Sequence, residues 1–483
     1  MLGTIMQILD STIANVALPH MQGTLSATQD QIAWVLTSYI VATAIMTLPA
    51  GWLAVRYGGK NVFTISVATF TFFSILCGLA TNIEQMVLFR VLQGVSGAAL
   101  IPISQATLLD INPREKHASA MAIWGAGIMI GPIIGPTLGG YLTEIYNWRW
   151  VFFINLPIGI LSFIGVMLFL PNNKQKSRSF DWLGFLTLAI VIGCIQLILD
   201  RGEQVDWLSS TEIFVYMAIS ASAIWVYVAH TMRTKNPLLP PAMFLDRNLV
   251  TSLIFMFFVG LILLATVALL PPYMQNLMGY SVIDTGILMA PRGAGTMLSM
   301  MIVGKFSGRI DPRILLLTGL SFTVISLNLM TGFTTFVPAE TIIWTGAIQG
   351  FGLGFIFVPL STIAYSTLHP KYRPEAASVF NLVRNIGSSV GISIVMTMLV
   401  RNMQLNHAYL TENITPYTFG VSWKQLPEGL SDTTSGLLGA LNGEISRQAT
   451  TIAYINDFSL MMWVVIACIP FVFLLRRPVE QDQ

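Results

Sequence analysis

Charged residues are scarce in this chain of 483 residues: Asp, Glu, Lys and Arg make up 10% of it, against about a quarter in soluble domains. Hydrophobic residues make up 54%, and the mean hydropathy is +0.70. The net charge is only +2, and the basic residues are scattered, so the sequence lacks the concentrated basic face that nucleic-acid binding requires. The composition excludes an ordinary soluble domain and indicates an integral membrane protein.

Cysteine and histidine are equally sparse. The three cysteines, Cys77, Cys194 and Cys468, lie inside apolar runs, which argues against a disulfide framework or a cysteine metal site. The five histidines are dispersed, and neither an HExxH motif nor a Walker A loop is present. We therefore expect no metal, no cofactor, no enzymatic activity and no ATP-driven pump, which leaves an ion gradient as the energy source.

What the sequence has in abundance is long apolar runs. A membrane-spanning helix needs about 20 apolar residues, and polar breaks divide the chain into fourteen such candidates. The first lacks a basic n-region and a small-residue cleavage site, so it is expected to be a membrane helix and not a signal peptide. The predicted spans are 2–19, 32–54, 61–80, 85–109, 118–141, 151–170, 182–200, 211–230, 248–270, 283–304, 313–331, 341–366, 377–400 and 457–475.

The positions of the basic residues predict the orientation. Of the 25 Lys and Arg residues, 17 fall in the loops on one side of this arrangement and five in the loops on the other. By the positive-inside rule the first side is cytoplasmic, which places both termini inside the cell. The remaining three, Arg90, Arg292 and Arg384, lie within helices, where facing lipid costs at least a few kcal/mol each. They are expected to face protein or water.

An internal echo predicts the domain organisation. "GWLAVRYGGK" (51–60) ends the second predicted helix, and "GKFSGRIDPR" (304–313) ends the tenth on the same side. Two six-helix halves would place such an echo six helices apart, so two helices are expected to be inserted between the halves. This gives an N-terminal bundle over 1–170, an inserted pair with its linkers over 171–247, and a C-terminal bundle over 248–483 with a long outside loop at about 401–456.

Five segments within the first third of the chain carry a family resemblance: "LDSTIANVALP" (9–19), "GWLAVRYGGK" (51–60), "LFRVLQGVSGAA" (88–99), "GPIIGPTLGG" (131–140) and "WRWVFFINLPIG" (148–159). In this order they resemble the signatures of the fourteen-helix drug:proton antiporters of the major facilitator superfamily. The resemblance implies an all-α membrane fold of two six-helix bundles plus two inserted helices. Val55 departs from the pattern, because the superfamily usually carries an acid there.

The resemblance also implies a function: proton-coupled export of hydrophobic toxic compounds by alternating access, as in multidrug efflux and antibiotic resistance, from the inner membrane. Two alternatives remain open, a proton-coupled carrier of one metabolite and a receptor or scaffold that keeps the transporter fold. Relatives of this kind work in tripartite systems, which implies a periplasmic membrane-fusion adaptor (EmrA-like) and an outer-membrane channel (TolC-like) as partners. Residues 431–455 are expected either to form an amphipathic helix on the outer surface or to remain a solvated loop.

Asp10 is the one acid that these spans place near the middle of a helix. A low dielectric disfavours an ionised carboxylate, so this group can exchange a proton when its access to solvent changes. Arg90, in the fourth helix, would be the fixed charge that favours ionised Asp10. A structural carboxylate at 10 and a snorkelling arginine at 90 are the alternatives. Asn15, Gln93 and Trp124 are expected to line a substrate cavity together with Asp10.

Two further motifs predict gating elements. The fifth helix carries Gly131, Pro132, Gly135, Pro136, Gly139 and Gly140, which would allow a kinked helix to pack tightly against the other half and seal the pathway; ordinary helix packing is the alternative. Gly51, Arg56, Gly58 and Lys60 are expected to form a tight cytoplasmic turn. Its cations could pair with acids or helix C-termini when the inside face is closed, or serve only as positive-inside anchors.

Overall fold

The structure is a computed structural model that describes residues 1–113, 116–170, 179–202, 205–234, 236–306, 310–412 and 434–475. Within these ranges the fold is helical and has no β-strand, which confirms the predicted all-α class. Several basic residues that served to predict the orientation, including Arg114, Lys174 and Lys424, lie outside the described residues, as does 413–433 of the predicted outside loop.

Each predicted span coincides with one helix or with two consecutive helices. In chain order the helices are α1 (Leu2–Thr24), α2 (Gln29–Tyr57), α3 (Gly59–Leu79), α4 (Ile83–Gly97), α5 (Leu100–Ile111), α6 (His117–Ile128), α7 (Ile130–Ile145), α8 (Trp150–Phe153), α9 (Asn155–Phe169), α10 (Trp182–Arg201), α11 (Thr211–Thr231), α12 (Arg247–Pro272), α13 (Val282–Phe306), α14 (Pro312–Met330), α15 (Ala339–Ser366), α16 (Arg373–Glu412) and α17 (Thr434–Cys468). A π-helical turn, Tyr273–Leu277, extends α12.

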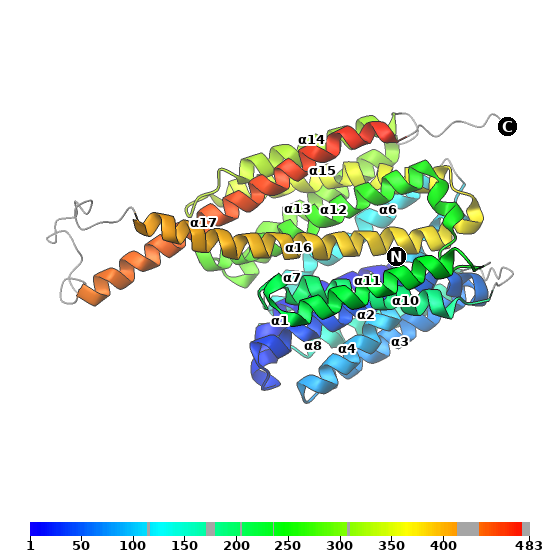
Figure 1. Cartoon of the computed structure of the whole chain (residues 1–483), viewed down its shortest axis with the longest axis horizontal. Coiled ribbons are helices and arrows are strands. Elements are labelled where there is room, and N and C mark those ends of the chain that lie inside the picture. Colours follow the sequence, from blue (N-terminus) through cyan, green and yellow to red (C-terminus); the bar gives the residue numbers. More distant parts are fainter. Residues whose placement is uncertain are drawn as a thin grey trace.

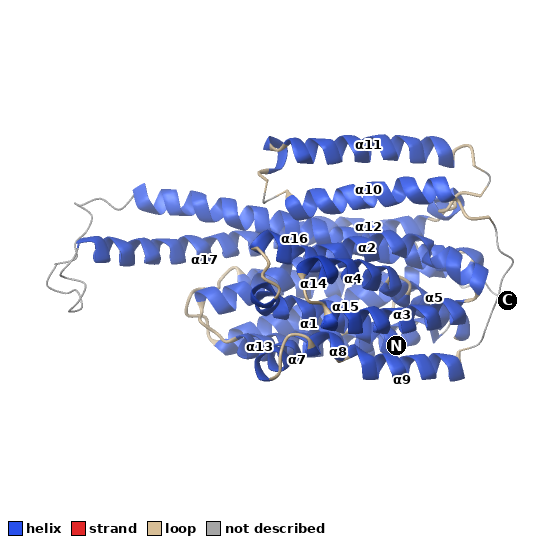
Figure 2. Cartoon of the chain, turned by 90° about the horizontal axis from the view of Figure 1, so that it is seen from below, coloured by secondary structure: helices blue, strands red, loops and turns tan. Residues whose placement is uncertain are grey.

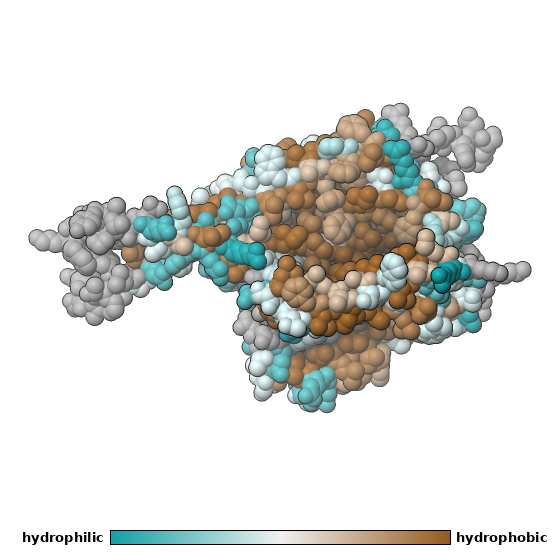
Figure 3. Space-filling view, in the orientation of Figure 1, coloured by the Kyte–Doolittle hydropathy of each residue, from teal (hydrophilic) through white to brown (hydrophobic). Residues whose placement is uncertain are grey.

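Thirteen spans among the described residues are long and apolar enough to cross a membrane. They start at α2, and α1, with 23 residues, runs among them as a further helix of membrane length. The helices lie roughly side by side, with α1–α4 on one side of Figure 1 and α12–α17 on the other. An apolar band covers the middle of the bundle surface, and hydrophilic residues gather towards its two ends (Figure 3). This distribution is the one that a bilayer requires.

Proline explains why the fourth and fifth spans are each broken into two helices. Pro102 has no N–H to donate to the carbonyl of Ala98, and the break between α4 and α5 lies there. The hydroxyl of Thr47 on α2 donates to this carbonyl instead, at 3.4 Å. Pro132 likewise removes the donor for the carbonyl of Ile128, where α6 ends before α7 begins. Each break bends its helix beside a neighbour, as membrane proteins tolerate.

The helices α10 and α11 form a pair at one edge of the molecule (Figure 2). The inner helix, α10, contacts α2 from one half and α16 from the other. At its end the backbone carbonyl of Leu199 accepts from the hydroxyl of Ser393 (2.7 Å), and the carboxylate of Asp200 accepts from that of Thr37. The outer helix, α11, packs mainly on α10 and leaves most of its surface exposed.

The predicted helix on the outer surface requires a correction. The end of α16 and the start of α17 do not lie along the membrane surface; they run side by side and project beyond the bundle (Figures 1 and 2). Asn406 donates to the carbonyl of Ala449 at 3.5 Å, and His407 hydrogen-bonds Asn442 at 2.9 Å. We call residues 401–412 and 439–456 the helical projection. It forms because α16 and α17, with 40 and 35 residues, are much longer than a bilayer requires.

The two echoed glycines lie at equivalent contacts between the halves. A Cβ on Gly51 would lie 2.8 Å from the backbone nitrogen of Glu375, at the start of α16. Gly304, at the corresponding end of α13, packs against the start of α6, where a Cβ would overlap Ala122 and lie 3.5 Å from the Cα of Ser119. In both places a helix end from one half packs against the first turn of a helix from the other half. These contacts lie on the side that the basic residues predict to be cytoplasmic.

The contact at Gly51 predicts the effect of one added methyl group. We expect Gly51→Ala to push the ends of α2 and α16 apart, since overpacking costs about 1–3 kcal/mol, and therefore to raise the population with an open cytoplasmic side about fivefold or more. Spin labels at the exposed residues Tyr57 and Ile314 would report this as a longer-distance population. The matched control is Gly59→Ala, whose Cβ would lie an ordinary 3.7 Å from Ile103. Identical distance distributions for the two variants would contradict the prediction.

Candidate functional site

Asp10 and Arg90 form an ion pair inside the N-terminal bundle. The guanidinium Nη1 of Arg90 on α4 lies 2.7 Å from Oδ2 of Asp10 on α1, and both side chains are 0% exposed. Asp10 lies within α1, away from both ends of the helix. The sequence predicted both residues as partners and left open whether they meet; in this structure they do.

Two amides complete the coordination of the carboxylate. Oδ1 of Asp10 accepts from Nε2 of Gln93 (2.9 Å) and from Nδ2 of Asn155 (2.6 Å), and both of these side chains are 0% exposed. The Nδ2 group of Asn155 also donates to the hydroxyl of Ser74 (2.9 Å), which in turn donates to the backbone carbonyl of Phe152. The carboxylate thus accepts from three donors on α4 and α9.

Arg90 is held on its other sides as well. Its Nε donates to the carbonyl of Val35 on α2 (3.0 Å), and its Nη1 donates to Oε1 of Gln93 (2.8 Å). The guanidinium carbon lies 4.2 Å from the centre of the Tyr39 ring, a cation–π distance. These contacts join α2 and α4 to α1 around a single charge pair, which we call the Asp10 cluster: Asp10, Arg90, Gln93, Asn155 and Ser74.

Full burial makes the cluster sensitive to protonation. Removing one partner of a buried ion pair costs about 3–5 kcal/mol, because the other charge is left uncompensated. A proton on Asp10 has a related effect, since it cancels the charge that balances Arg90. A change in the charge of Asp10 would therefore act on α1 and on the helices that hold Arg90.

Two other predicted cavity residues lie apart from this cluster. Asn15 is exposed and makes none of the cluster's hydrogen bonds. Trp124 is fully buried on α6, where its Nε1 donates to the hydroxyl of Ser104 (2.9 Å) and its ring stacks on Phe357 of α15, with centroids 6.3 Å apart. It lies at the boundary between the halves. Of the four predicted cavity residues, only Asp10 and Gln93 are brought together.

The glycines of the fifth span face a different helix from the one expected. The sequence predicted tight packing against the other half, but Gly131 and Gly139 lie against α1, where a Cβ would come within 2.9 Å of Ile8 and 3.1 Å of Ile13. At Gly135 a Cβ would overlap the hydroxyl of Thr12. A repeat of four residues places the three glycines along one face of α7. The correction is physical: these three glycines make room for the helix that carries Asp10.

The opposite face of α7 meets the other half through glycines that belong to α13. A Cβ on Gly293 would overlap Ile133, and one on Gly286 would lie 2.6 Å from the hydroxyl of Thr137. The helix α7 is therefore packed closely against α1 on one side and α13 on the other. Gly140 is buried and Pro136 lies within α7. Pro132 marks the break from α6.

The cations of the predicted cytoplasmic turn bind within their own half, whereas Gly51 contacts α16 of the other half. Gly58 adopts φ +88°, a conformation that favours glycine, and it joins α2 to α3. Nζ of Lys60 donates to the carbonyl of Met167 at the C-terminal end of α9 (2.7 Å). The guanidinium of Arg56 lies 5.2 Å from the centre of the Trp52 ring. Lys60 thus contacts a helix C-terminus, the partner that the sequence analysis named.

The described residues show other features that sequence reasoning missed. Asn155 lies in the segment 148–159 that carried part of the family resemblance, but its spacing gave no reason to expect a hydrogen bond to Asp10. Asp457 was placed at the start of a span, although it lies well inside α17 and is 0% exposed. The sequence feature that could have placed Asp457 inside a helix is the helical spacing of apolar residues before it, in 434–456. Among the described residues, no three His, Cys, Asp or Glu side chains come together as a metal site.

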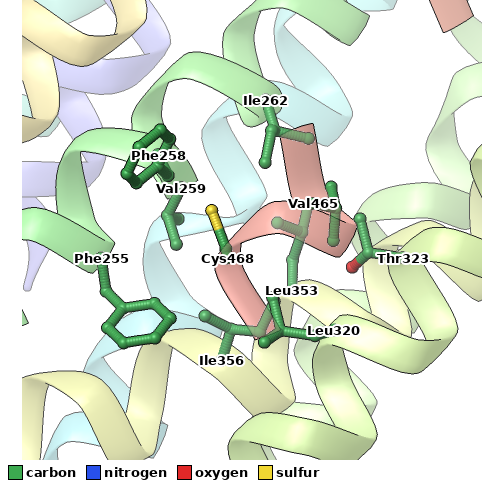
Figure 4. Close-up of a pocket in the computed structure, with 10 residues that line it drawn as sticks. All are labelled: Phe255, Phe258, Val259, Ile262, Leu320, Thr323, Leu353, Ile356, Val465 and Cys468. Atoms are coloured by element: carbon green, nitrogen blue, oxygen red, sulfur yellow. The ribbon is translucent and has the colours of Figure 1, made fainter. Parts of the chain in front are cut away.

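A small apolar cavity lies within the C-terminal bundle, and none of its lining residues belongs to the Asp10 cluster. It is enclosed by α12, α14, α15 and α17, and Figure 4 labels its lining residues. Its hydroxyl group, from Thr323, already donates to the carbonyl of Gly319 (2.9 Å). With no polar group free to orient a ligand, this cavity is a gap in helix packing and not a match for the predicted substrate site.

Comparisons with known proteins agree with one another. Residues 1–392 match the family model described as Major Facilitator Superfamily. The chain is 34% identical to the Multidrug export protein EmrB of Escherichia coli (strain K12), over 99% of this chain and 94% of that protein. It is also 34% identical to the Fatty acid resistance protein FarB of Neisseria gonorrhoeae, over 99% and 95% of the two chains.

A solved structure resembles the fold at much lower sequence identity. The human organic anion transporter MFSD10 is 12% identical, with a TM-score of 0.59 over 96% of this chain and 97% of that one. At this identity the likeness concerns the arrangement of helices alone.

The seam between α1 and α7 predicts the effect of one large side chain. We expect Gly135→Leu to displace α1, because its side chain would occupy the space of Thr12. At a cost of about 1–3 kcal/mol for overpacking, coupled flux of protons and a substrate dye across proteoliposome membranes should fall about tenfold or be replaced by a proton leak. Gly165→Leu on α9, where nothing lies within 4 Å of a Cβ, is the control. Normal flux without leak in Gly135→Leu would reduce the seam to ordinary helix packing.

Proposed function

The chain belongs to the major facilitator superfamily, and we propose that it is a multidrug exporter driven by protons, which moves hydrophobic toxic compounds out of the cell by alternating access. The family and the fold point to a transporter and not to an enzyme. The observation that carries the proton-coupling part is the Asp10 cluster: a titratable carboxyl, 0% exposed, that is paired with a permanent cation. Arginine stays charged at all relevant pH values, so the proton in this pair can reside only on Asp10.

Proton binding would act on the position of α1. In the ionised state Asp10 attracts Arg90 and accepts from Gln93 and Asn155. A protonated carboxyl has no net charge and one fewer site to accept hydrogen bonds, so the attraction that holds α1 against α4 and α9 weakens. The proton is released again when Asp10 returns to its three donors.

A route from α1 to the other half runs through α7. This helix meets α1 at Gly135 and α13 at Gly293, with no room for a side chain at either contact. Closely packed helices shift together, because interiors of this density transmit displacement. Movement of α1 would therefore reach α13 and change how the two halves meet.

The cytoplasmic side offers contacts that such a movement could open. Nδ2 of Asn381 on α16 donates to Oε1 of Gln105 on α5 (2.6 Å), and both residues are buried. Nearby, Arg373 lies 3.7 Å from the carboxylate of Asp110. Both pairs join the two halves. Their separation would expose the pathway to the cytoplasm, where a compound enters.

We propose the proton gradient as the sole energy source, with no cofactor. Each charge that moves down the membrane potential supplies about 2.3 kcal/mol per 100 mV, which suits modest uphill export. Hydrophobic drugs are the proposed cargo, since relatives at 34% identity are named for multidrug export and fatty acid resistance. Both termini are proposed to be cytoplasmic in an inner membrane, on the basis of the positive-inside asymmetry.

The helical projection is the proposed docking surface for a partner. A hydrophobic compound released just outside the inner membrane would partition back into it, so onward transport needs a periplasmic membrane-fusion adaptor (EmrA-like) and an outer-membrane channel (TolC-like). The projection reaches away from the bundle, at the end opposite to the one where the C-terminus is marked in Figures 1 and 2. Leu405 and Tyr409, 67% and 69% exposed and four residues apart, form an apolar face on it. Such a face suits packing against an adaptor helix.

Transport measurements on Asp10 variants test the proposed function. Asp10→Asn keeps the size and polarity of the side chain but cannot exchange a proton, so gradient-driven export in proteoliposomes should fall to the level of empty liposomes. Exchange of labelled drug without a gradient should persist. Asp10→Glu, which keeps a titratable group, should retain part of the export. Because Asn leaves Arg90 without its counter-charge, thermal melting of each variant must accompany the flux data.

Several outcomes would decide between the candidate functions. Normal gradient-driven export by Asp10→Asn would remove this residue as the proton carrier. Export of a single metabolite, with none of a panel of chemically unrelated drugs, would indicate a dedicated carrier. Absence of any substrate-dependent proton flux in the unmodified protein would indicate a receptor or scaffold.

Binding of an adaptor is tested on the projection by a charge substitution. Leu405→Glu places a carboxylate on the apolar face and should weaken pull-down of a co-expressed adaptor about tenfold or more, because an unpaired charge would be buried at the contact. Drug transport by the variant in vesicles should be unchanged. Gln404→Glu, which adds the same charge at the neighbouring exposed position, is the control. Equal pull-down by both variants would exclude this face from the interface.

A further inference from the structure

A second carboxyl is buried in the C-terminal bundle. Asp457 lies on α17 and is 0% exposed, like Asp10. Residue 474, at the cytoplasmic end of this segment, is 17 residues further along the chain, which corresponds to roughly 25 Å at 1.5 Å per residue. Asp457 is therefore buried near the outer side of the membrane, below the helical projection. The mechanism proposed above makes no use of it.

The surroundings of Asp457 differ from those of Asp10. Asp10 accepts from three donors, whereas both carboxyl oxygens of Asp457 are buried without a hydrogen-bond partner among the described residues. Aromatic rings fill this region. Tyr454 packs on Tyr273, with ring centroids 5.2 Å apart, and Phe458 packs on Phe333 at 6.0 Å.

Charged groups on the helices around α17 do not compensate Asp457. On α12 and α14 the charged side chains are Arg247 and Arg313, which bind the carbonyls of Leu474 and Leu475 at the cytoplasmic end. The π-helical turn contributes only Tyr273, whose hydroxyl donates to the carbonyl of Thr334.

On α16 the cation whose position along the helix is nearest to that of Asp457 is Arg401. This follows from the contact between Asn406 and Ala449, because Arg401 lies five residues before Asn406. Arg401 is exposed, and no ion pair joins it to Asp457 in the described part of the chain. The other charged residues of α16 are Arg373, Glu375, Arg384 and Glu412, at its two ends or further towards the cytoplasm. On α17 itself Tyr454 is the neighbouring titratable group.

An ionised carboxylate is disfavoured in this place. Burial of a charge without a partner is costly in a low dielectric, and such a group takes up a proton instead. Asp457 differs in this respect from Asp10, whose charge is balanced. The two buried acids thus have opposite surroundings in one conformation, one with three donors and one with none among the described residues.

We propose that Asp457 is a second proton-binding site, in the C-terminal half, which carries its proton in the conformation described here. One proton from the outer aqueous phase adds to a carboxylate oxygen of Asp457 and is lost again when a rearrangement of α17 against α12 and α14 brings water to the group. Its part in export rests on the proposed function. The binding of the proton does not, and can be measured without transport.

Infrared spectroscopy tests the protonation directly. A protonated carboxyl has a C=O stretching band that an ionised carboxylate lacks. At neutral pH, the spectrum of the purified protein minus that of Asp457→Asn should contain this band. Subtraction of Asp10→Asn should not produce it, because Asp10 is ion-paired. Since Asn replaces a neutral group of the same size, Asp457→Asn should melt close to the unmodified protein, which shows that the variant is folded.

Proton flux tests the part that Asp457 has in transport. In proteoliposomes, Asp457→Asn should still export drug but move fewer protons per drug molecule, measured from the membrane potential at which net drug flux reverses. A difference spectrum without the C=O band would overturn the proposal, whatever the flux shows. A band with an unchanged proton-to-drug ratio would overturn the role in transport, whereas loss of coupling in Asp10→Asn alone bears only on the proposed function.

Discussion

Compensation of a buried carboxylate is the constraint on which the N-terminal half depends. Asp10 has no contact with solvent, so its charge must be balanced by protein groups that come from several helices: Arg90 and Gln93 from α4 and Asn155 from α9. Arg90 in turn needs the carbonyl of Val35 on α2. One charge pair thereby fixes the relative positions of four helices. A change in its protonation acts on all of them, which is the property that a proton-driven transporter needs.

Close helix packing converts that local constraint into a link between the halves. The glycines of α7 allow α1 to approach on one face, and the glycines of α13 allow the second half to approach on the other. In a bilayer, where lipid is as apolar as a leucine side chain, such small-residue contacts are a main source of helix association. Close packing at both seams places α7 between α1 and α13, so that a movement of α1 can reach the second half through it.

The two echoed glycines make similar contacts between the halves. Gly51 of the N-terminal half and Gly304 of the C-terminal half each pack against the first turn of a helix from the opposite half. Buried Asp457, on the last long helix, has no hydrogen-bond partner for either carboxyl oxygen among the described residues. The two halves thus make similar glycine contacts, whereas their buried acids have different surroundings.

The sequence by itself determined the features that depend on local composition. Apolar length alone predicted where the helices lie, since each span must cross the same thickness of hydrocarbon. The prolines at 102 and 132 determined the breaks in two spans, because a missing N–H acts on the carbonyl four residues earlier. A single acid in an apolar helix also marked Asp10 as a candidate functional residue, whereas no local pattern identified Asn155 as its amide partner.

Only the tertiary structure decided which side chains meet. A glycine face can pack against either neighbour, and Gly135 faces Thr12 on α1, not the second half, because close contact requires a complementary surface that no single helix specifies. The helical projection follows from pairing between α16 and α17, which extends both helices beyond the bundle. The burial of Asp457 depends on the elements that pack on α17, such as the aromatic residues Tyr273 and Phe333. Hydropathy predicts which segments are long enough to span lipid. The burial of a given side chain depends on neighbours that are distant in the chain.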